Sequence, residues 1–223
     1  MTTDFCIKRW SILFTAVLLG CIISISCYAY YVYCAEFLWV GKSFYFLVSY
    51  NPHVEVAVHT ARLEGGAGYL LFDGREEYTV YSVYLRDDIA RTVQAGMQDE
   101  AMLVEKDVEY LVFKGRDKRF TEFYHGALNG LYGCIEVLSK SITMLENGAV
   151  QQTCKRILTI LEKQFAYMAT TYKEDYPTFA EVCETVREGL NKILLDVVYC
   201  KDLRYVLCMA CDGYLQLSSK FSL

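Results

Sequence analysis

An uninterrupted apolar run near the N-terminus constrains this chain more than any other feature. Residues 10–35 contain no charged side chain and exceed the roughly 20 apolar residues that a membrane-spanning helix needs. Lys8 and Arg9 stand directly before the run. Because basic residues favour the cytoplasmic side of a membrane helix, the sequence predicts a cytoplasmic tail over residues 1–9, one transmembrane helix over 10–35 and an extracytoplasmic body over 37–223 in the cell membrane.

Two other interpretations of the same run stay open. A cleaved signal peptide has an apolar region of about 7–15 residues before its cleavage site, and this run is longer. Residues 18–21 read Leu-Leu-Gly-Cys, as in a bacterial lipoprotein signal, where Cys21 would be lipidated after cleavage. The residues after Cys21 stay apolar through Tyr33, where a mature lipoprotein usually becomes polar. The uncleaved anchor is therefore the interpretation that the residues favour.

Charge and histidine content exclude several classes of function. The net charge is −5, and the charged residues before position 37 cancel, so the body is acidic and lacks the basic stripe of a nucleic-acid-binding protein. His53 and His59 are six residues apart on one expected helix and do not share a face as a metal-binding pair would. No nucleophile elbow or other catalytic motif occurs. The sequence therefore predicts a protein that is not an enzyme and has no metal or cofactor.

Six of the ten cysteines lie in the body of the chain, where export would permit disulfides. Most of them fall on apolar stripes of expected helices, where a free cysteine behaves as a small hydrophobic residue. Buried thiols are the favoured interpretation, and at least one disulfide is the alternative. Cys208 and Cys211 have the spacing of a redox or metal pair, but no second pair accompanies them. The six are Cys134, Cys154, Cys183, Cys200, Cys208 and Cys211.

Residues 42–113 alternate between strand-like and helix-like segments. The expected strands cover residues 44–50, 69–72, 78–85 and 102–104, with 108–113 as either a fifth strand or the return into the next region. One helix follows Asn51-Pro52 and ends at Gly65-Gly66, and a second begins at Asp87. The order β-α-β-β-α-β predicts a ferredoxin-like sheet with both helices on one face. The other face is then a candidate binding surface, with Tyr50, Tyr69, Tyr81 and Tyr84 as its aromatic groups.

Residues 119–223 carry apolar residues at spacings of three and four, which is typical of helices that pack lengthwise. The stripes cover residues 124–145, 150–172, 179–197 and 203–217. Asn147-Gly148 and Tyr176-Pro177 separate successive stripes. The sequence predicts an antiparallel bundle of about four helices, preceded by a solvated linker at residues 114–119. The fold class expected for the whole chain is therefore α+β.

The first half of the body resembles the SPOR (sporulation-related) domain of bacterial envelope proteins. The resemblance covers about residues 42–106 and rests on the strand-helix pairs FYFLVSY at 44–50 with the helix from Pro52, and YTVYSVYL at 78–85 with the helix from Asp87. It implies binding to peptidoglycan glycan strands at a division or sporulation septum through the helix-free sheet face. The chain differs from the usual SPOR arrangement, in which the domain is C-terminal and follows a long linker.

These observations suggest two functions, one of which requires an open sheet face and the other a covered one. The first is a membrane-anchored, extracytoplasmic binding module of the bacterial cell envelope, with a glycan held on an open sheet face. The second is a non-catalytic scaffold or oligomerisation protein, in which the helical bundle covers the sheet and binds a protein partner. An open aromatic face would favour the first function, and a covered face would favour the second.

Overall fold

The computed structural model of the chain describes residues 23–26, 37–49, 53–72, 76–97, 101–113 and 123–219. Residues 39–110 and 122–223 form one compact unit, and residues 1–38 and 111–121 belong to a second. Within the described ranges, no helix is long and apolar enough to cross a membrane. The membrane helix predicted at residues 10–35 lies outside those ranges except for 23–26, which are helical.

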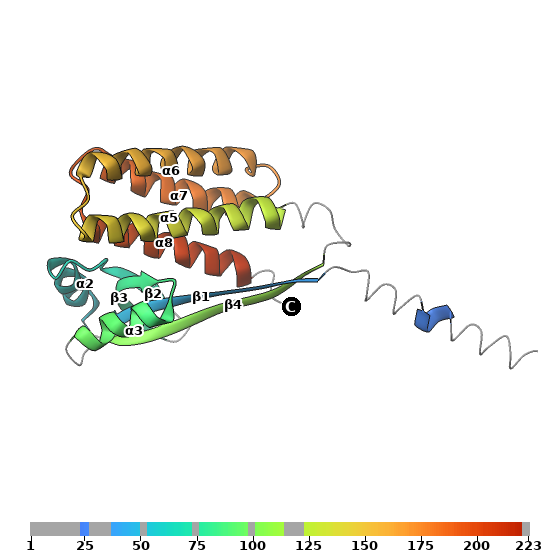
Figure 1. The fold of residues 1–223 in the computed structure, drawn as a ribbon, viewed down its shortest axis with the longest axis horizontal. Helices are drawn as coiled ribbons and strands as arrows, with labels where there is room; N and C mark the ends of the chain where they lie inside the picture. Colours follow the sequence, from blue (N-terminus) through green and yellow to red (C-terminus); the bar gives the residue numbers. More distant parts are fainter. Residues whose placement is uncertain are drawn as a thin grey trace, which may run out of the picture. The chain divides into compact units, whose positions relative to one another are not determined.

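The larger unit contains the predicted α+β arrangement, with a four-stranded antiparallel sheet in the order β2-β3-β1-β4. The elements follow one another in the predicted order β-α-β-β-α-β (Figure 1). They are β1 (Phe37–Ser49), α2 (Val54–Leu63), β2 (Tyr69–Phe72), β3 (Glu77–Tyr84), α3 (Asp87–Gly96) and β4 (Met102–Phe113). A register shift between Leu47 and Val48 marks an irregularity where β1 pairs with β3.

Two strands are longer than the sequence predicts. β1 begins at Phe37, whereas the sequence predicts the first strand only from residue 44. β4 is continuous from Met102 to Phe113, where the sequence pattern is interrupted by three charged residues. β4 is an edge strand, and Glu105 and Asp107 are exposed there. An edge strand tolerates charged side chains that face water, and for this reason the polar stretch does not end it.

The turn after α2 has the role that its glycines predict. Gly65 has a φ of 87°, which lies in the left-handed region that favours glycine. The Gly66 N–H donates a hydrogen bond of 2.7 Å to the Ala61 carbonyl, which closes a Schellman cap at the helix end. The Ala67 N–H then donates to the Tyr81 carbonyl at 2.7 Å. The glycine-rich segment therefore ends α2 and joins the next residues to the edge of β3.

Four long helices follow the sheet and are joined by short connections, so that neighbours run in opposite directions (Figure 1). A single π-helical turn, η1 (Tyr124–Leu128), leads into α5 (Asn129–Glu146), followed by α6 (Gln151–Thr171), α7 (Pro177–Leu194) and α8 (Cys200–Ser219). The predicted stripes form the core of this bundle. Leu131, Leu161, Leu190 and Leu207, one from each helix, are at most 1% exposed.

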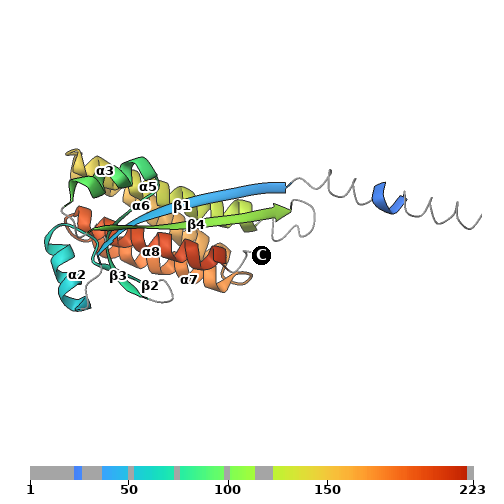
Figure 2. The same ribbon diagram turned by 90° about the horizontal axis from the view of Figure 1, so that it is seen from below.

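The bundle and the sheet share one core because α8 packs against β2 and β3. Tyr214 of α8 is fully buried, and its ring centre lies 5.5 Å from that of Phe44 on β1. Phe44 also meets Tyr132 of α5 at 6.1 Å. Figure 2 shows β1 and β4 running roughly along the length of the bundle helices. The sheet face that the sequence leaves without helices is therefore covered, over β2 and β3, by α8.

Candidate functional site

Tyr69, expected on an open sheet face, is engaged by α8. Its hydroxyl donates a hydrogen bond of 2.7 Å to Oδ2 of Asp212, and its ring centre lies 5.4 Å from that of Tyr205. Burial raises the pKa of the Tyr69 phenol, and the hydrogen bond to Asp212 raises it further. The neutral phenol therefore serves to join β2 to α8.

The other expected binding tyrosines have different surroundings. Burial raises the pKa of Tyr84, on which the charges of Arg204 and Glu146 from the bundle also act. Tyr81 packs beside the turn after α2, because a Cβ on Gly66 would lie only 2.8 Å from its Cδ1. Tyr50 lies outside the described residues. The structure thus brings Tyr69 and Tyr84 to the bundle side and places Tyr81 against the turn after α2.

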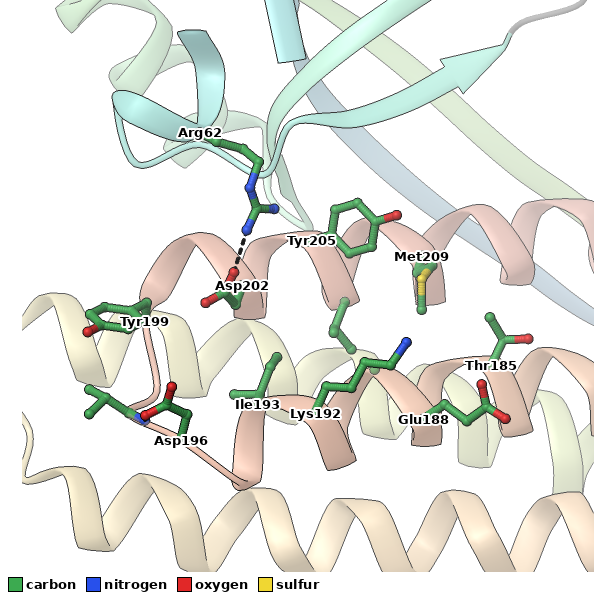
Figure 3. A pocket seen from close by; sticks show the side chains of 13 residues that line it. Arg62, Thr185, Glu188, Lys192, Ile193, Asp196, Tyr199, Asp202, Tyr205 and Met209 are labelled. Carbon is green, nitrogen blue, oxygen red and sulfur yellow. Dashed lines mark hydrogen bonds and ion pairs between the residues drawn. The ribbon is translucent and has the colours of Figure 1, made fainter. Parts of the chain in front are cut away.

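A groove of about 500 Å³ lies between α7 and α8 and reaches the end of α2 (Figure 3). Its apolar lining comes from the last turns of α7, from the connection that follows and from the first half of α8. Gly189 of α7 lets the two helices approach closely, since a Cβ there would lie 3.0 Å from Cγ2 of Val206 and 3.3 Å from Cε of Met209. The main apolar lining residues are Ile193, Val197, Tyr205, Val206 and Met209.

An ion pair fixes the α2 end of this groove. Nη2 of Arg62 lies 2.6 Å from Oδ1 of Asp202, and the two side chains are 36% and 29% exposed (Figure 3). Nη1 of Arg62 donates to the Ala67 carbonyl at 3.1 Å. Arg204, two residues later on α8, donates to the Gly65 carbonyl. These contacts attach the start of α8 to the turn after α2 and make the groove wall from two distant parts of the chain.

Exposed apolar side chains continue the groove onto the end of the bundle. In the connection between α7 and α8, Leu195 is 88% exposed, Val197 47% and Tyr199 52%. Val150, in the connection between α5 and α6, is 68% exposed. Two hydrogen bonds between the Gln151 side chain and the Val198 backbone, of 2.9 and 3.2 Å, hold the two connections side by side. We refer to the groove together with Val150, Leu195 and Tyr199 as the α7–α8 surface.

Two oppositely charged residues of α7 border the groove. Glu188 and Lys192 are four residues apart, both are exposed, and both line it (Figure 3). Within the described part of the chain, Lys192 has no hydrogen bond or ion pair. Asp196 also lines the groove, but its Oδ1 accepts a hydrogen bond of 2.8 Å from the Val197 N–H. The surface thus combines an apolar floor with charges of both signs at its border.

The cysteines of the body are structural thiols. All six are free, and five are buried, with Cys200 half-buried, so the disulfide alternative is wrong for these positions. Burial raises the pKa of Cys134 to about 11 and that of Cys183 to about 12. The pKa values of Cys208 and Cys211 are also raised by burial. The described residues contain no group of three potential metal ligands. The Cys208–Cys211 spacing therefore belongs to the buried face of α8.

Sequence reasoning missed the α7–α8 surface and its ion pair. Val150 and Val197 were expected on buried stripes, but both lie in connections just beyond helix ends and are exposed. The residues from Leu194 to Tyr199 read LLDVVY, an apolar composition that is unusual for a connection between helices, and this signal could have identified the surface. The pairing of Arg62 with Asp202 left no local signal, because the two residues are 140 positions apart.

The comparisons with known proteins do not assign a family. No protein-family model, curated protein or solved structure matches this chain.

Proposed function

We propose that this chain is a non-catalytic, membrane-anchored scaffold that binds a protein partner through the α7–α8 surface. The observation that carries the proposal is the exposure of Leu195, Val197 and Tyr199 beside an apolar groove. Soluble proteins rarely expose large contiguous apolar patches unless the patch binds something. Aromatic residues such as Tyr199 and Tyr205 are enriched at protein interfaces, where a large apolar body carries a polar tip.

The packing of α8 on the sheet supports this function over ligand binding on the sheet. The Tyr69 hydroxyl donates its hydrogen bond to Asp212, and Phe44 packs against Tyr214. A ligand that stacked on this part of the face would have to displace α8, whose inward side is almost fully buried. The bundle and the sheet therefore act as one body that presents its apolar surface at α7 and α8.

The place of action follows from the N-terminal run. The charge-free residues 10–35 supply a single anchor, and Lys8 and Arg9 favour a cytoplasmic N-terminus. The body would then lie outside the cytoplasm at the cell membrane, and the SPOR resemblance implies that this is the envelope of a bacterium. An anchor raises the local concentration of the body at the membrane, so that a surface of modest affinity can still be occupied.

Site-specific photocrosslinking in intact membranes tests the proposal. A photoreactive phenylalanine analogue replaces Tyr199 in the full chain, and the control carries it at Tyr167, which is 69% exposed on α6 and outside the α7–α8 surface. We expect a discrete intermolecular adduct from position 199, lost when Leu195→Asp is added, and none from position 167. Equal adducts from both positions, or none from either, would refute the assigned surface.

Glycan binding by a SPOR-like domain is the second candidate, favoured by the topology of the sheet. The order β-α-β-β-α-β with strands arranged β2-β3-β1-β4 is that of a ferredoxin-like split βαβ sheet. A shared topology alone does not establish a shared function. The test is co-sedimentation of the full chain, in detergent, with peptidoglycan sacculi stripped of stem peptides. Retention that falls in the Tyr81→Ala, Tyr84→Ala variant supports glycan binding, and no retention refutes it.

A further inference from the structure

We propose that the partner at the α7–α8 surface is a second copy of this chain, in a two-fold symmetric dimer. The inference rests on the proposed function and names its partner. In a two-fold dimer the same patch meets itself, so the patch must be self-complementary in charge and shape. The two oppositely charged residues of α7 that border the groove meet the charge part of this requirement.

The charge pattern on α7 is self-complementary when two copies of the helix lie antiparallel. Glu188 and Lys192 lie on the same exposed side, one helical turn apart. A two-fold axis that passes between them places Glu188 of each copy opposite Lys192 of the other. Two ion pairs then form across the axis from one pair of positions. Within the described residues Lys192 has no partner in its own chain, so its ammonium group is free to make this contact.

The other charged residues that line the groove are Arg62, Asp196 and Asp202. Arg62 and Asp202 neutralise each other at 2.6 Å. Asp196 lies beyond the end of α7 and caps the Val197 N–H. Within α7 itself, the charged residues that line the groove are Glu188 and Lys192, one of each sign.

The apolar residues of the surface supply the area that a dimer must bury. Leu195, Val197, Tyr199 and Tyr205 are all exposed, and the last three of them line the groove. Burial of such side chains provides most of the affinity in a protein interface, whereas bordering charges set its register and exclude wrong pairings. The two ion pairs thus specify the antiparallel register of the two copies.

A charge-exchange experiment tests the dimer with the full chain in detergent. Sedimentation velocity measures self-association of the wild type, Glu188→Lys, Lys192→Glu and the control Lys163→Glu, which changes an exposed lysine of α6. Each groove variant places like charges opposite each other twice, so we expect its self-association to weaken about tenfold or more. The control should associate like the wild type.

Mixing the two groove variants gives the decisive result. A chain with Glu at positions 188 and 192 complements a chain with Lys at both, so we expect the mixture to form a heterodimer as tight as the wild-type dimer. A heterodimer also demonstrates that both variants are folded. A monomeric wild type, groove variants that associate normally, or a mixture that stays monomeric would overturn the inference.

The crosslinking at position 199 shows whether a negative result concerns only the dimer or also the proposed scaffold function. An adduct that contains two differently tagged copies of the chain supports the dimer. An adduct with a different protein, together with a monomeric wild type, overturns the dimer and leaves the scaffold function standing. The absence of any adduct at position 199 overturns both.

Discussion

The hydroxyl of Tyr69 donates a hydrogen bond of 2.7 Å to the carboxylate of Asp212, which joins β2 to α8 across 143 positions of the sequence. The contact makes the α/β segment and the bundle parts of one body. It also engages the hydroxyl of Tyr69, which the sequence predicts as one of the aromatic groups that would bind a glycan. Because this contact holds α8 against the sheet, its removal should change the measured stability of the protein.

We expect Tyr69→Phe to lower the free energy of unfolding by about 1.5–3 kcal/mol, the range for a hydrogen bond to a charged group. The ring contact with Tyr205 remains in this variant, so the loss reports on the hydroxyl. Urea denaturation followed by circular dichroism measures it. Tyr205→Phe is the matched control, because the Tyr205 hydroxyl has no hydrogen bond in the described part of the chain. Equal losses in both variants would contradict the assigned role of the Tyr69–Asp212 bond.

Two helical glycines should respond in opposite directions to alanine. A Cβ on Gly213 of α8 would collide with Cγ1 of Val182 on α7, whereas a Cβ on Gly133 of α5 would have no atom within 4 Å. We expect Gly213→Ala to destabilise the protein by about 1–3 kcal/mol through overpacking. Gly133→Ala should stabilise it by up to about 1 kcal/mol through helix propensity. Thermal or urea denaturation measures both, and a stabilising Gly213→Ala would refute the close packing of α7 on α8.

Stability should fall in alkaline solution because of the buried thiols. The folded-state pKa of Cys134 is about 11, against an ordinary value of 9.0. Between these two pH values the unfolded chain releases the thiol proton and the folded chain keeps it, so the unfolded state binds fewer protons and the free energy of unfolding falls as pH rises. Each such thiol contributes at most about 1.4 kcal/mol per pH unit.

Urea denaturation between pH 8 and pH 11 measures this slope. Cys183, whose pKa is raised to about 12, acts in the same direction. The variant Cys134→Ala, Cys183→Ala should show a shallower loss over the same range. An identical slope in the variant and the wild type would show that these thiols are not the buried groups responsible.

The elements themselves were predictable because they rest on local patterns. The spacing of three and four marks the bundle helices, and Leu131, Leu161, Leu190 and Leu207 are buried as that spacing predicts. The glycines after α2 form the predicted cap, since a left-handed residue at a helix end favours glycine. Such signals act over a few residues and are visible in any one sequence.

The packing of α8 on the sheet could not be predicted in the same way. α8 carries apolar residues on much of its circumference. In the sequence, the apolar residues that face the bundle therefore cannot be distinguished from those that face the sheet. Asp202 and Asp212 look like ordinary solvent-exposed residues of a helix, and their partners Arg62 and Tyr69 lie far away in sequence. Long-range polar contacts of this kind leave no periodic pattern.

Hydroxyl-radical footprinting of the tyrosines compares, in one measurement, the solvent exposure of the sheet face with that of the α7–α8 surface. The full chain is labelled in dilute detergent and in its native membrane. The account predicts slow labelling of Tyr69 and Tyr84 in both, and fast labelling of Tyr199 and Tyr205 in detergent that slows in the membrane. Fast labelling of Tyr84 in detergent, or protection in the membrane at Tyr84 and not at Tyr199, would contradict it.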